Sequence, residues 1–252
     1  MLGIVLSAVL PAQEPQQGAK PRIQPAAAAW SAREARAALA AFRKAAGGRK
    51  VSLARRLQAL EALARGRHDL LVKPLARLVA SDPAVTVRRR AARALAAQPP
   101  RKARPALIRL LEDQNVRETP AVLAEVVRAL SAAGYAARDW PRLERLFERD
   151  FGAAYVPVHK ALLELVAAHR EVRAWKLLLR HLDEPRPVDV HSPGNPPASY
   201  WEKRWKAWRA WRSDVREALH AISGQRFGSA EEARVWAEDN PARLRPRPKR
   251  RK

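Results

Sequence analysis

Apolar residues recur every three or four positions along most of the chain, which is the spacing of one face of an α-helix. The segment 71–97 shows this pattern most clearly. Its second half places five apolar residues on one stripe, namely Ala84, Val87, Ala91, Ala94 and Leu95. Three arginines, Arg89, Arg90 and Arg93, fall on the opposite face. The pattern predicts a helix that is buried on one side and cationic on the other.

An apolar stripe upstream of this helix, from Leu70 to Val79, predicts a second amphipathic helix. Between the two stripes, Asp82 followed by Pro83 is typical of an N-cap and a first helical residue. Pro74 inside the first helix should bend it. The short connection predicts that the two helices are antiparallel.

The same reading predicts helices along most of the chain. Their ranges are 31–46, 52–65, 68–80, 84–97, 101–112, 118–134, 139–150, 154–169, 171–182, 200–223 and 230–239. Equivalent positions at Pro74, Pro105 and Pro141 are 31 and 36 residues apart, and Trp175 follows after 34 more. A period of this length predicts stacked structural repeats.

One repeat carries a more specific pattern, in which Pro74 is followed by Asp82, Val87 and Arg88. This pattern resembles the HEAT repeat. The resemblance implies an all-α, right-handed α-solenoid of about five stacked antiparallel helix pairs, with a short C-terminal capping helix. It also implies that Asp82 and Arg88 form bonds between neighbouring repeats. Tetratricopeptide and ankyrin arrays have similar periods, but their signature residues are missing.

The C-terminal part supports the same family. Gly224 is expected to end a helix, Ser229 to begin the next, and Phe227 and Trp236 to seal the stack. The segment 218–241 resembles the end of bacterial exported HEAT-repeat proteins. That resemblance implies a binding or scaffold protein and brings no catalytic residues.

The N-terminal residues 1–12 are expected to be a signal peptide, with an apolar run from Leu2 to Leu10 and cleavage near Ala12. We therefore expect a periplasmic or secreted protein with no transmembrane segment in the mature chain. Because no Lys or Arg precedes the run, a cytoplasmic protein is the alternative. The expected parts that follow are a linker (13–29), helical repeats (30–183), a proline-rich loop (184–199), a last repeat helix with the capping helix (200–240) and a basic tail (241–252).

The last long helix is rich in tryptophan. Trp201, Trp205, Trp208 and Trp211 fall within about a third of its circumference, and Val215, Leu219 and Ile222 continue the stripe. This continuity favours a core face. The alternative is a binding site of stacked rings bordered by Arg204, Arg209 and Arg212, next to the proline-rich loop.

Metal-binding residue types cluster only around that loop, at His181, Asp183, Glu184, Asp189 and His191. Their spacing matches no known metal or acid-base motif, so we expect a solvated loop, no metal and no cofactor. The chain has no cysteine, which excludes disulfides and thiolate chemistry.

The net charge is a weak indication of the binding partner. The chain has 49 Lys and Arg against 25 Asp and Glu, a net charge of +24. Such an excess is typical of polyanion binding, but arginine and alanine enrichment also follows from a GC-rich coding sequence. The excess lies in the two ends, including the tail, whereas the middle is nearly balanced.

These observations predict a monomeric, non-enzymatic scaffold that binds a protein or peptide on its concave face, through Arg89, Arg90 and Arg93 among others. The alternative is a basic nucleic-acid-binding protein similar to the HEAT-like alkylpurine-DNA glycosylases. These enzymes need a carboxylate among exposed aromatic and arginine residues, and no residue clearly fills that role. A HEAT-like bilin lyase is a weaker alternative.

Overall fold

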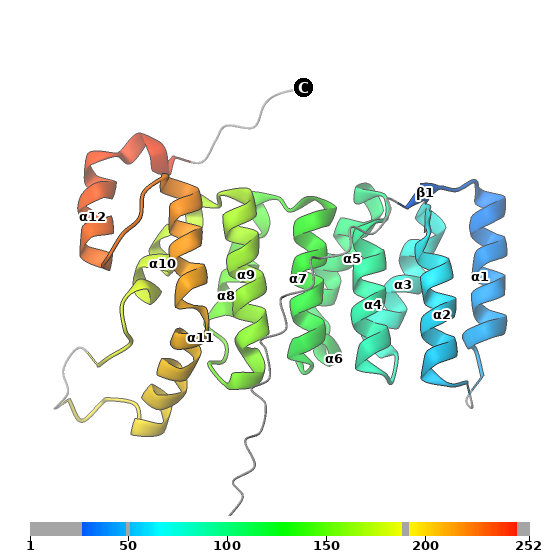
Figure 1. The fold of residues 1–252 in the computed structure, drawn as a ribbon, viewed down its shortest axis with the longest axis horizontal. Coiled ribbons are helices and arrows are strands. Elements are labelled where there is room, and N and C mark those ends of the chain that lie inside the picture. The colour runs from blue at the N-terminus through cyan, green and yellow to red at the C-terminus, as the bar shows by residue number, and fades with distance from the viewer. Residues whose placement is uncertain (1–26, 49–50, 188–191, 246–252) are drawn as a thin grey trace, which may run out of the picture.

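Antiparallel helix pairs stack side by side along one axis (Figure 1). The computed structural model describes residues 27–48, 51–187 and 192–245. The pairs are α1 (Ala32–Ala46) with α2 (Leu53–Ala64), α3 (Asp69–Ser81) with α4 (Val85–Ala96), α5 (Pro100–Glu112) with α7 (Pro120–Gly134), α8 (Trp140–Phe147) with α9 (Val156–His169), and α10 (Trp175–Leu182) with α11 (Ala198–Ser223). A last helix, α12 (Ala230–Asp239), contacts α10. The predicted all-α solenoid with a short capping helix is therefore confirmed.

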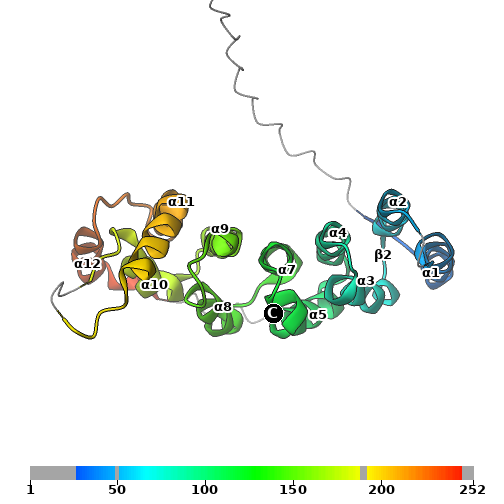
Figure 2. The same cartoon turned by 90° about the horizontal axis from the view of Figure 1, so that it is seen from below.

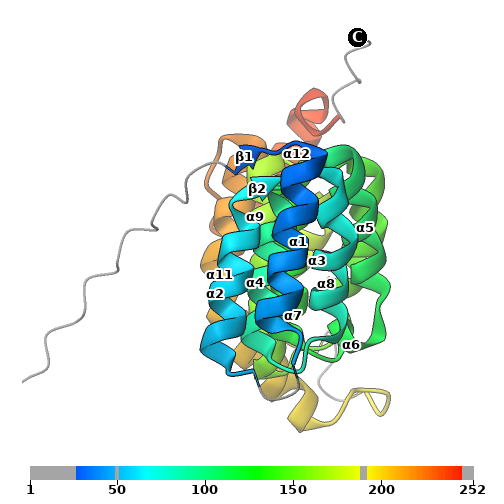
Figure 3. The same ribbon diagram turned by 90° about the vertical axis from the view of Figure 1, so that its right-hand side faces the viewer.

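The pairs form two layers that curve together. Figure 2 shows α2, α4, α7, α9 and α11 along the concave side, and α1, α3, α5, α8 and α10 along the convex side. The same two layers are seen along the stack in Figure 3. Each concave helix contacts the next one in this order. The second helix of every pair therefore lines the concave surface (Figure 2).

The core lies between the layers, because each helix buries the apolar stripe that its sequence predicts. In α4 the stripe residues Val87, Ala91 and Leu95 are 0–1% exposed. The facing stripe of α3 is equally buried at Leu71 and Leu75. Burial of such side chains contributes roughly 1.5–3 kcal/mol for each large aliphatic residue.

Several connections are more ordered than the sequence predicts. A short helix, α6 (Gln114–Arg117), lies between α5 and α7. Single 3-10 turns lead into three helices and follow the last one; these are η1 (Ala137–Asp139), η2 (Ala153–Tyr155), η3 (Val172–Ala174) and η4 (Pro241–Leu244). Consequently α8 and α10 are shorter than the predicted ranges.

The prolines that suggested the repeat are not strictly equivalent. Pro74 and Pro105 lie inside α3 and α5, where each removes a helical N–H, but Pro141 lies in the first turn of α8. Asp82 also differs from its predicted position, because α4 begins at Val85 and Ala84 is its N-cap. The carboxylate of Asp82 still accepts a hydrogen bond from the Ala84 N–H, at 2.8 Å.

Two short strands lie at one edge of the first two helix pairs (Figure 1). Strand β1 (Ala28–Ala29) pairs in parallel with β2 (Gly66–Arg67), which joins α2 to α3. The pairing begins two residues before Trp30, inside the range predicted as linker. The predicted signal peptide and the linker up to residue 26 lie outside the described residues.

The C-terminal end is closed as predicted. Gly224 ends α11 with φ of 79°, a left-handed conformation that favours glycine. The Ser229 side chain accepts a hydrogen bond from the backbone N–H of Glu232 and so caps α12. The rings of Trp175, Phe227 and Trp236 lie 5.6–6.0 Å apart between their centroids. This aromatic cluster covers the apolar end of α10.

Candidate functional site

The three arginines predicted to bind a partner lie on the concave side, but each one already has a carboxylate partner. Arg89 and Arg93 bind Glu125 of α7 at 3.1 Å and 2.8 Å, and Arg90 binds Glu61 of α2 at 3.0 Å. These bonds join α4 to the helices on both sides of it. The structure therefore gives these arginines a role between repeats.

Glu125 is the centre of this arrangement. It lies among apolar residues of α7, and its side chain is only 4% exposed. Burial alone would raise the pKa of this carboxyl, but hydrogen bonds from Arg93 and Arg89 outweigh it and hold the pKa below its usual range. Glu125 is consequently ionised at neutral pH and lies between half-exposed arginines.

Similar ion pairs join the other concave helices. Arg128 of α7 binds Glu164 of α9 at 2.7 Å, and Lys160 of α9 lies 3.7 Å from Asp214 of α11. With Glu61, Arg90 and the Glu125 pairs, every junction of the concave layer from α2 to α11 carries at least one ion pair. We call this series the concave ion-pair ladder. Each cation of the ladder is therefore paired with a carboxylate of a neighbouring concave helix.

The repeat-motif residues also connect neighbouring repeats. Arg56 of α2 donates two hydrogen bonds of 3.0 Å to the Asp82 carboxylate. The buried Arg88 donates to the Val79 carbonyl and, at 3.0 Å, to the Thr119 hydroxyl of the next repeat. Asp82 therefore bonds backward and Arg88 forward, as the resemblance implies for the two residues.

The tryptophan stripe of α11 divides into two parts. Trp208 and Trp211 are buried at 8% and 1% exposure, and the Trp211 ring packs against Phe147 and His181. This half belongs to the core, as favoured from the sequence. Trp201 and Trp205, about two turns and one turn before Trp208, are only partly buried and lie beside the proline-rich loop.

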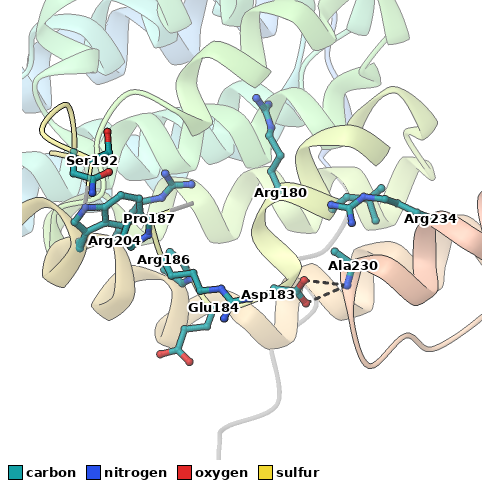
Figure 4. A pocket seen from close by; sticks show the side chains of 13 residues that line it. Arg180, Asp183, Glu184, Arg186, Pro187, Ser192, Arg204, Ala230 and Arg234 are labelled. Atoms are coloured by element: carbon teal, nitrogen blue, oxygen red, sulfur yellow. Dashed lines mark hydrogen bonds between the residues drawn. The ribbon is translucent and has the colours of Figure 1, made fainter. Parts of the chain in front are cut away.

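A pocket of about 530 Å³ lies at this end of the solenoid, between α10, α11, α12 and the loop. We call it the C-terminal pocket. Figure 4 shows Arg204, Pro187 and Ser192 on one side of it and Arg234 of α12 on the other, with Arg180 between them. Trp201 also lines it. The structure thus brings together a predicted tryptophan, a predicted arginine and the loop.

The pocket has an excess of positive charge. Its two carboxylates have other partners, since Asp183 accepts from the Ala230 N–H and Glu184 accepts from the Trp205 indole. Arg180 pairs with Glu148, at 3.3 Å, and Arg234 pairs with Glu231, at 2.8 Å. Arg186 and Arg204 form no ion pair with a described residue, although the charge of Arg204 helps to lower the pKa of Glu148.

Arg204 is held by aromatic rings. Its guanidinium carbon lies 4.9 Å from the centroid of Phe151 and 6.0 Å from those of Tyr200 and Trp201, and it donates a hydrogen bond to the Tyr200 hydroxyl. The other two predicted arginines lie over rings of their own helix, Arg209 over Trp205 and Arg212 over Trp208. Arg204 is therefore the predicted arginine that faces the pocket.

The residues considered for a metal site have separate roles. His181 is buried beside Phe147, with its Nε2 atom 3.2 Å from Glu148, and Asp183 caps α12. Asp189 and His191 lie outside the described residues. Within residues 27–48, 51–187 and 192–245 no three potential ligands are grouped to hold a metal ion.

Sequence reasoning missed the partners that complete these sites. Glu125 could have been noticed as the lone charge in the apolar run 121–127. Arg186 and Phe151 gave no signal, because one lies in a loop and the other precedes α9 in a separate helix pair.

Comparison with protein families identifies HEAT repeats at residues 72–154, from α3 to η2. Neither curated proteins nor solved structures gave a match to the chain. No helix in the part of the chain described by the structure is long and apolar enough to span a membrane.

Proposed function

We propose that this chain, which matches HEAT repeats at residues 72–154, is a non-enzymatic scaffold that binds an acidic segment of a partner protein in the C-terminal pocket. HEAT repeats generally act as protein-interaction scaffolds. Stacked repeats provide a long surface whose parts are held in fixed positions.

The observation that carries the proposal is the unpaired charge of Arg186 and Arg204 beside Trp201. A guanidinium group binds a carboxylate with two parallel hydrogen bonds, and such charge-assisted bonds are stronger than neutral ones. The rings around Arg204 fix its direction, so less side-chain entropy is lost on binding. A Glu or Asp side chain of a partner, with an apolar neighbour against Trp201, fits this arrangement.

The concave face is a second surface for the same partner. The side chains of Arg89 and Arg93 are 44% and 48% exposed, so their outer edges can still donate hydrogen bonds. An acidic partner would compete there with Glu125, whereas a segment with few charges would not. We therefore assign the concave face to contacts with backbone carbonyls and polar side chains.

Nucleic-acid binding is less well supported. A protein that follows a duplex needs unpaired cations along its track, whereas Arg89, Arg93 and Arg128 in the middle of the concave layer are paired with carboxylates. Base-excision chemistry also needs an available carboxylate beside exposed rings. Glu125, the buried carboxylate of the concave helices, is bound by two arginines instead.

A peptide-display selection tests the proposal. Peptides selected by the protein should be enriched in Glu or Asp next to an apolar residue, and Arg204→Gln should weaken their binding by roughly tenfold or more. Arg216→Gln is the matched control, because Arg216 is an exposed arginine of the same helix outside the pocket. Selected peptides whose binding resists both Arg204→Gln and Arg186→Gln would contradict the pocket assignment.

Export is proposed on the apolar run Leu2 to Leu10. The native protein should then begin near Gln13 and fractionate outside the cytosol. Intact-mass measurement after cell fractionation tests this. A chain that keeps Met1 in the cytosol would overturn the proposal and favour the nucleic-acid alternative.

A further inference from the structure

Two neighbouring grooves are lined by residues of α1, α3 and α5. These convex helices lie at the end of the solenoid opposite to α11 and α12 (Figure 2). One of about 400 Å³ lies between α1 and α3, and one of about 920 Å³ lies between α3 and α5. Lys73 on α3 lines both of them. The two grooves therefore form one continuous surface, which we call the convex basic grooves.

Cations dominate the rims of this surface. Six lysines and arginines line it, namely Arg43, Lys73, Arg77, Arg101, Lys102 and Arg109. All six are exposed, and none forms an ion pair with a described residue. The contrast with the concave ion-pair ladder is clear, because there each cation faces a carboxylate on the next helix.

Only two acidic residues line the grooves, Asp69 and Asp113. The Asp113 carboxylate accepts a hydrogen bond from the Val116 N–H and thus caps α6. Asp69 lies in the first turn of α3, where a negative charge is favoured by the helix dipole. Neither one neutralises the rims, which therefore keep a strong positive field.

The floors of the grooves are apolar. Leu39, Phe42 and Leu78 line the narrower groove, and Leu70, Ala76 and Ala106 line the wider one. Leu70 is 39% exposed, which is unusual for a large aliphatic residue in this chain. An apolar floor between cationic rims matches a ligand that has both acidic and apolar side chains.

We propose that the convex basic grooves bind an acidic amphipathic segment of a partner protein, with carboxylates on the rims and apolar side chains on the floors. Charge complementarity selects an acidic ligand. A flat anionic bilayer or a nucleic-acid duplex would contact the rims, but it could not fill floors recessed between helices. A peptide segment is narrow enough to do so, in the manner of helix-in-groove recognition.

The test uses a synthetic helix of roughly 18 residues that has leucine on one face and glutamate elsewhere. Its binding to the full chain is measured by fluorescence anisotropy at moderate salt. We expect the double variant Lys73→Glu/Arg77→Glu to weaken binding by roughly tenfold or more. Leu70→Ser should weaken binding by several-fold, because it removes an apolar contact and leaves the charge unchanged.

Lys203→Glu/Arg216→Glu is the matched control. It makes the same change in net charge on exposed, unpaired positions of α11, so a general electrostatic effect would weaken binding equally in both double variants. A second peptide, with serine in place of leucine, should bind at least several-fold more weakly than the first. Equal effects of the two double variants, or equal binding of the two peptides, would overturn the proposal.

The alternatives are distinguished in the same experiment. Vesicles of phosphatidylcholine with about one quarter phosphatidylserine, and a short DNA duplex, replace the peptide. If either ligand binds with dependence on Lys73, Arg77 and Leu70 while the leucine peptide does not bind, the grooves recognise that ligand and the proposal is wrong. Arg204 does not line these grooves, so Arg204→Gln should leave binding of the leucine peptide unchanged. The groove proposal and the pocket proposal can therefore fail independently of each other.

Discussion

Glu125 shows how one residue can hold two repeats together. Its carboxylate is buried but accepts hydrogen bonds from Arg89 and Arg93. Glu125→Gln keeps the shape and removes the charge, so these arginines lose charge-assisted bonds. We expect the free energy of unfolding to fall by about 1–3 kcal/mol, measured by urea denaturation.

Glu61→Gln is the control for this prediction. The Glu61–Arg90 pair lies on the same surface, but the glutamate side chain is 53% exposed. Such pairs contribute about 0–1 kcal/mol, so the loss should be much smaller. Equal losses in the two variants would contradict the role given to Glu125.

His159 predicts a pH dependence of stability. Burial lowers its pKa to about 4, from 6.5 in the unfolded chain, although the Nε2 contact with the Phe147 carbonyl acts in the opposite direction. Between these values the unfolded chain binds the proton and the folded chain does not. Above pH 6.5, His159 therefore contributes roughly 3 kcal/mol to the free energy of unfolding, and this contribution is lost as the pH falls toward 4.

Urea denaturation at pH 7, 6 and 5 measures this dependence. Burial also lowers the pKa of the neighbouring His181, so it adds to the same slope. His159→Leu should flatten the dependence of the free energy of unfolding on pH, because a leucine side chain cannot bind a proton. His169→Gln is the control, since His169 lies at the surface beside Ser131. If His159→Leu keeps the full pH dependence, His159 does not cause that dependence.

Which arginines face away from the core could be predicted from helical periodicity alone. That Arg89 and Arg93 meet Glu125 could not, because the contact depends on how α4 and α7 stack. Side-chain partners across a solenoid junction are set by the angle and offset between repeats. These quantities have no counterpart in the local pattern of apolar residues.

At the scale of the helices, the sequence predicts most of the structure, because each helix buries a stripe with a period of 3.6 residues. The 3-10 turns before α8 and α10 were missed, since single turns are too short to show a period. The strand β1 was missed for another reason. Its residues Ala28 and Ala29 have low strand propensity and pair only because β2 is held beside them.

Gly66 allows that pairing, and this leads to a prediction. A Cβ atom at Gly66 would lie 2.0 Å from the Trp30 ring, so Gly66→Ala must displace Trp30 and the strand that precedes it. We expect the bond from the Ala28 N–H to the Arg65 carbonyl to be lost. Amide hydrogen exchange at Ala28 and Trp30 should become at least tenfold faster.

Gly194→Ala is the control, because a Cβ there would meet only Ser192, at the ordinary distance of 3.8 Å. The Gln98 side chain should keep its bonds to the His68 N–H and the Ala94 carbonyl in both variants. Unchanged exchange at Ala28 in Gly66→Ala would mean that the Trp30 ring moves away without opening the strand pair.

At the scale of the whole molecule, stacking forms the C-terminal pocket and the convex basic grooves. The tryptophan helix and the loop were predicted to meet because they are adjacent in sequence. The convex basic grooves were not predicted, since their cations come from α1, α3 and α5 and gather only when three repeats stack. Stacking also produces ion pairs across the junctions of the concave layer and a group of unpaired cations at one convex end, neither of which the net charge of +24 reveals.

A solenoid has two ends that need covering, because the terminal repeats have a neighbour on one side only. Here the C-terminal end is covered by Phe227 and Trp236 against Trp175, which is 7% exposed. Truncation after Gly224 removes both rings and exposes Trp175. We expect the free energy of unfolding to fall by about 3 kcal/mol or more and the protein to self-associate through the exposed end.

Thermal unfolding and light scattering over a range of protein concentrations measure these effects. Truncation after Arg245 is the matched control, because it keeps α12 and removes a large part of the basic tail. If charge repulsion by the tail kept the protein monomeric, both truncations would self-associate. If the aromatic cluster is the cap, only the shorter chain will do so, and Trp236→Ala will reproduce part of its loss of stability.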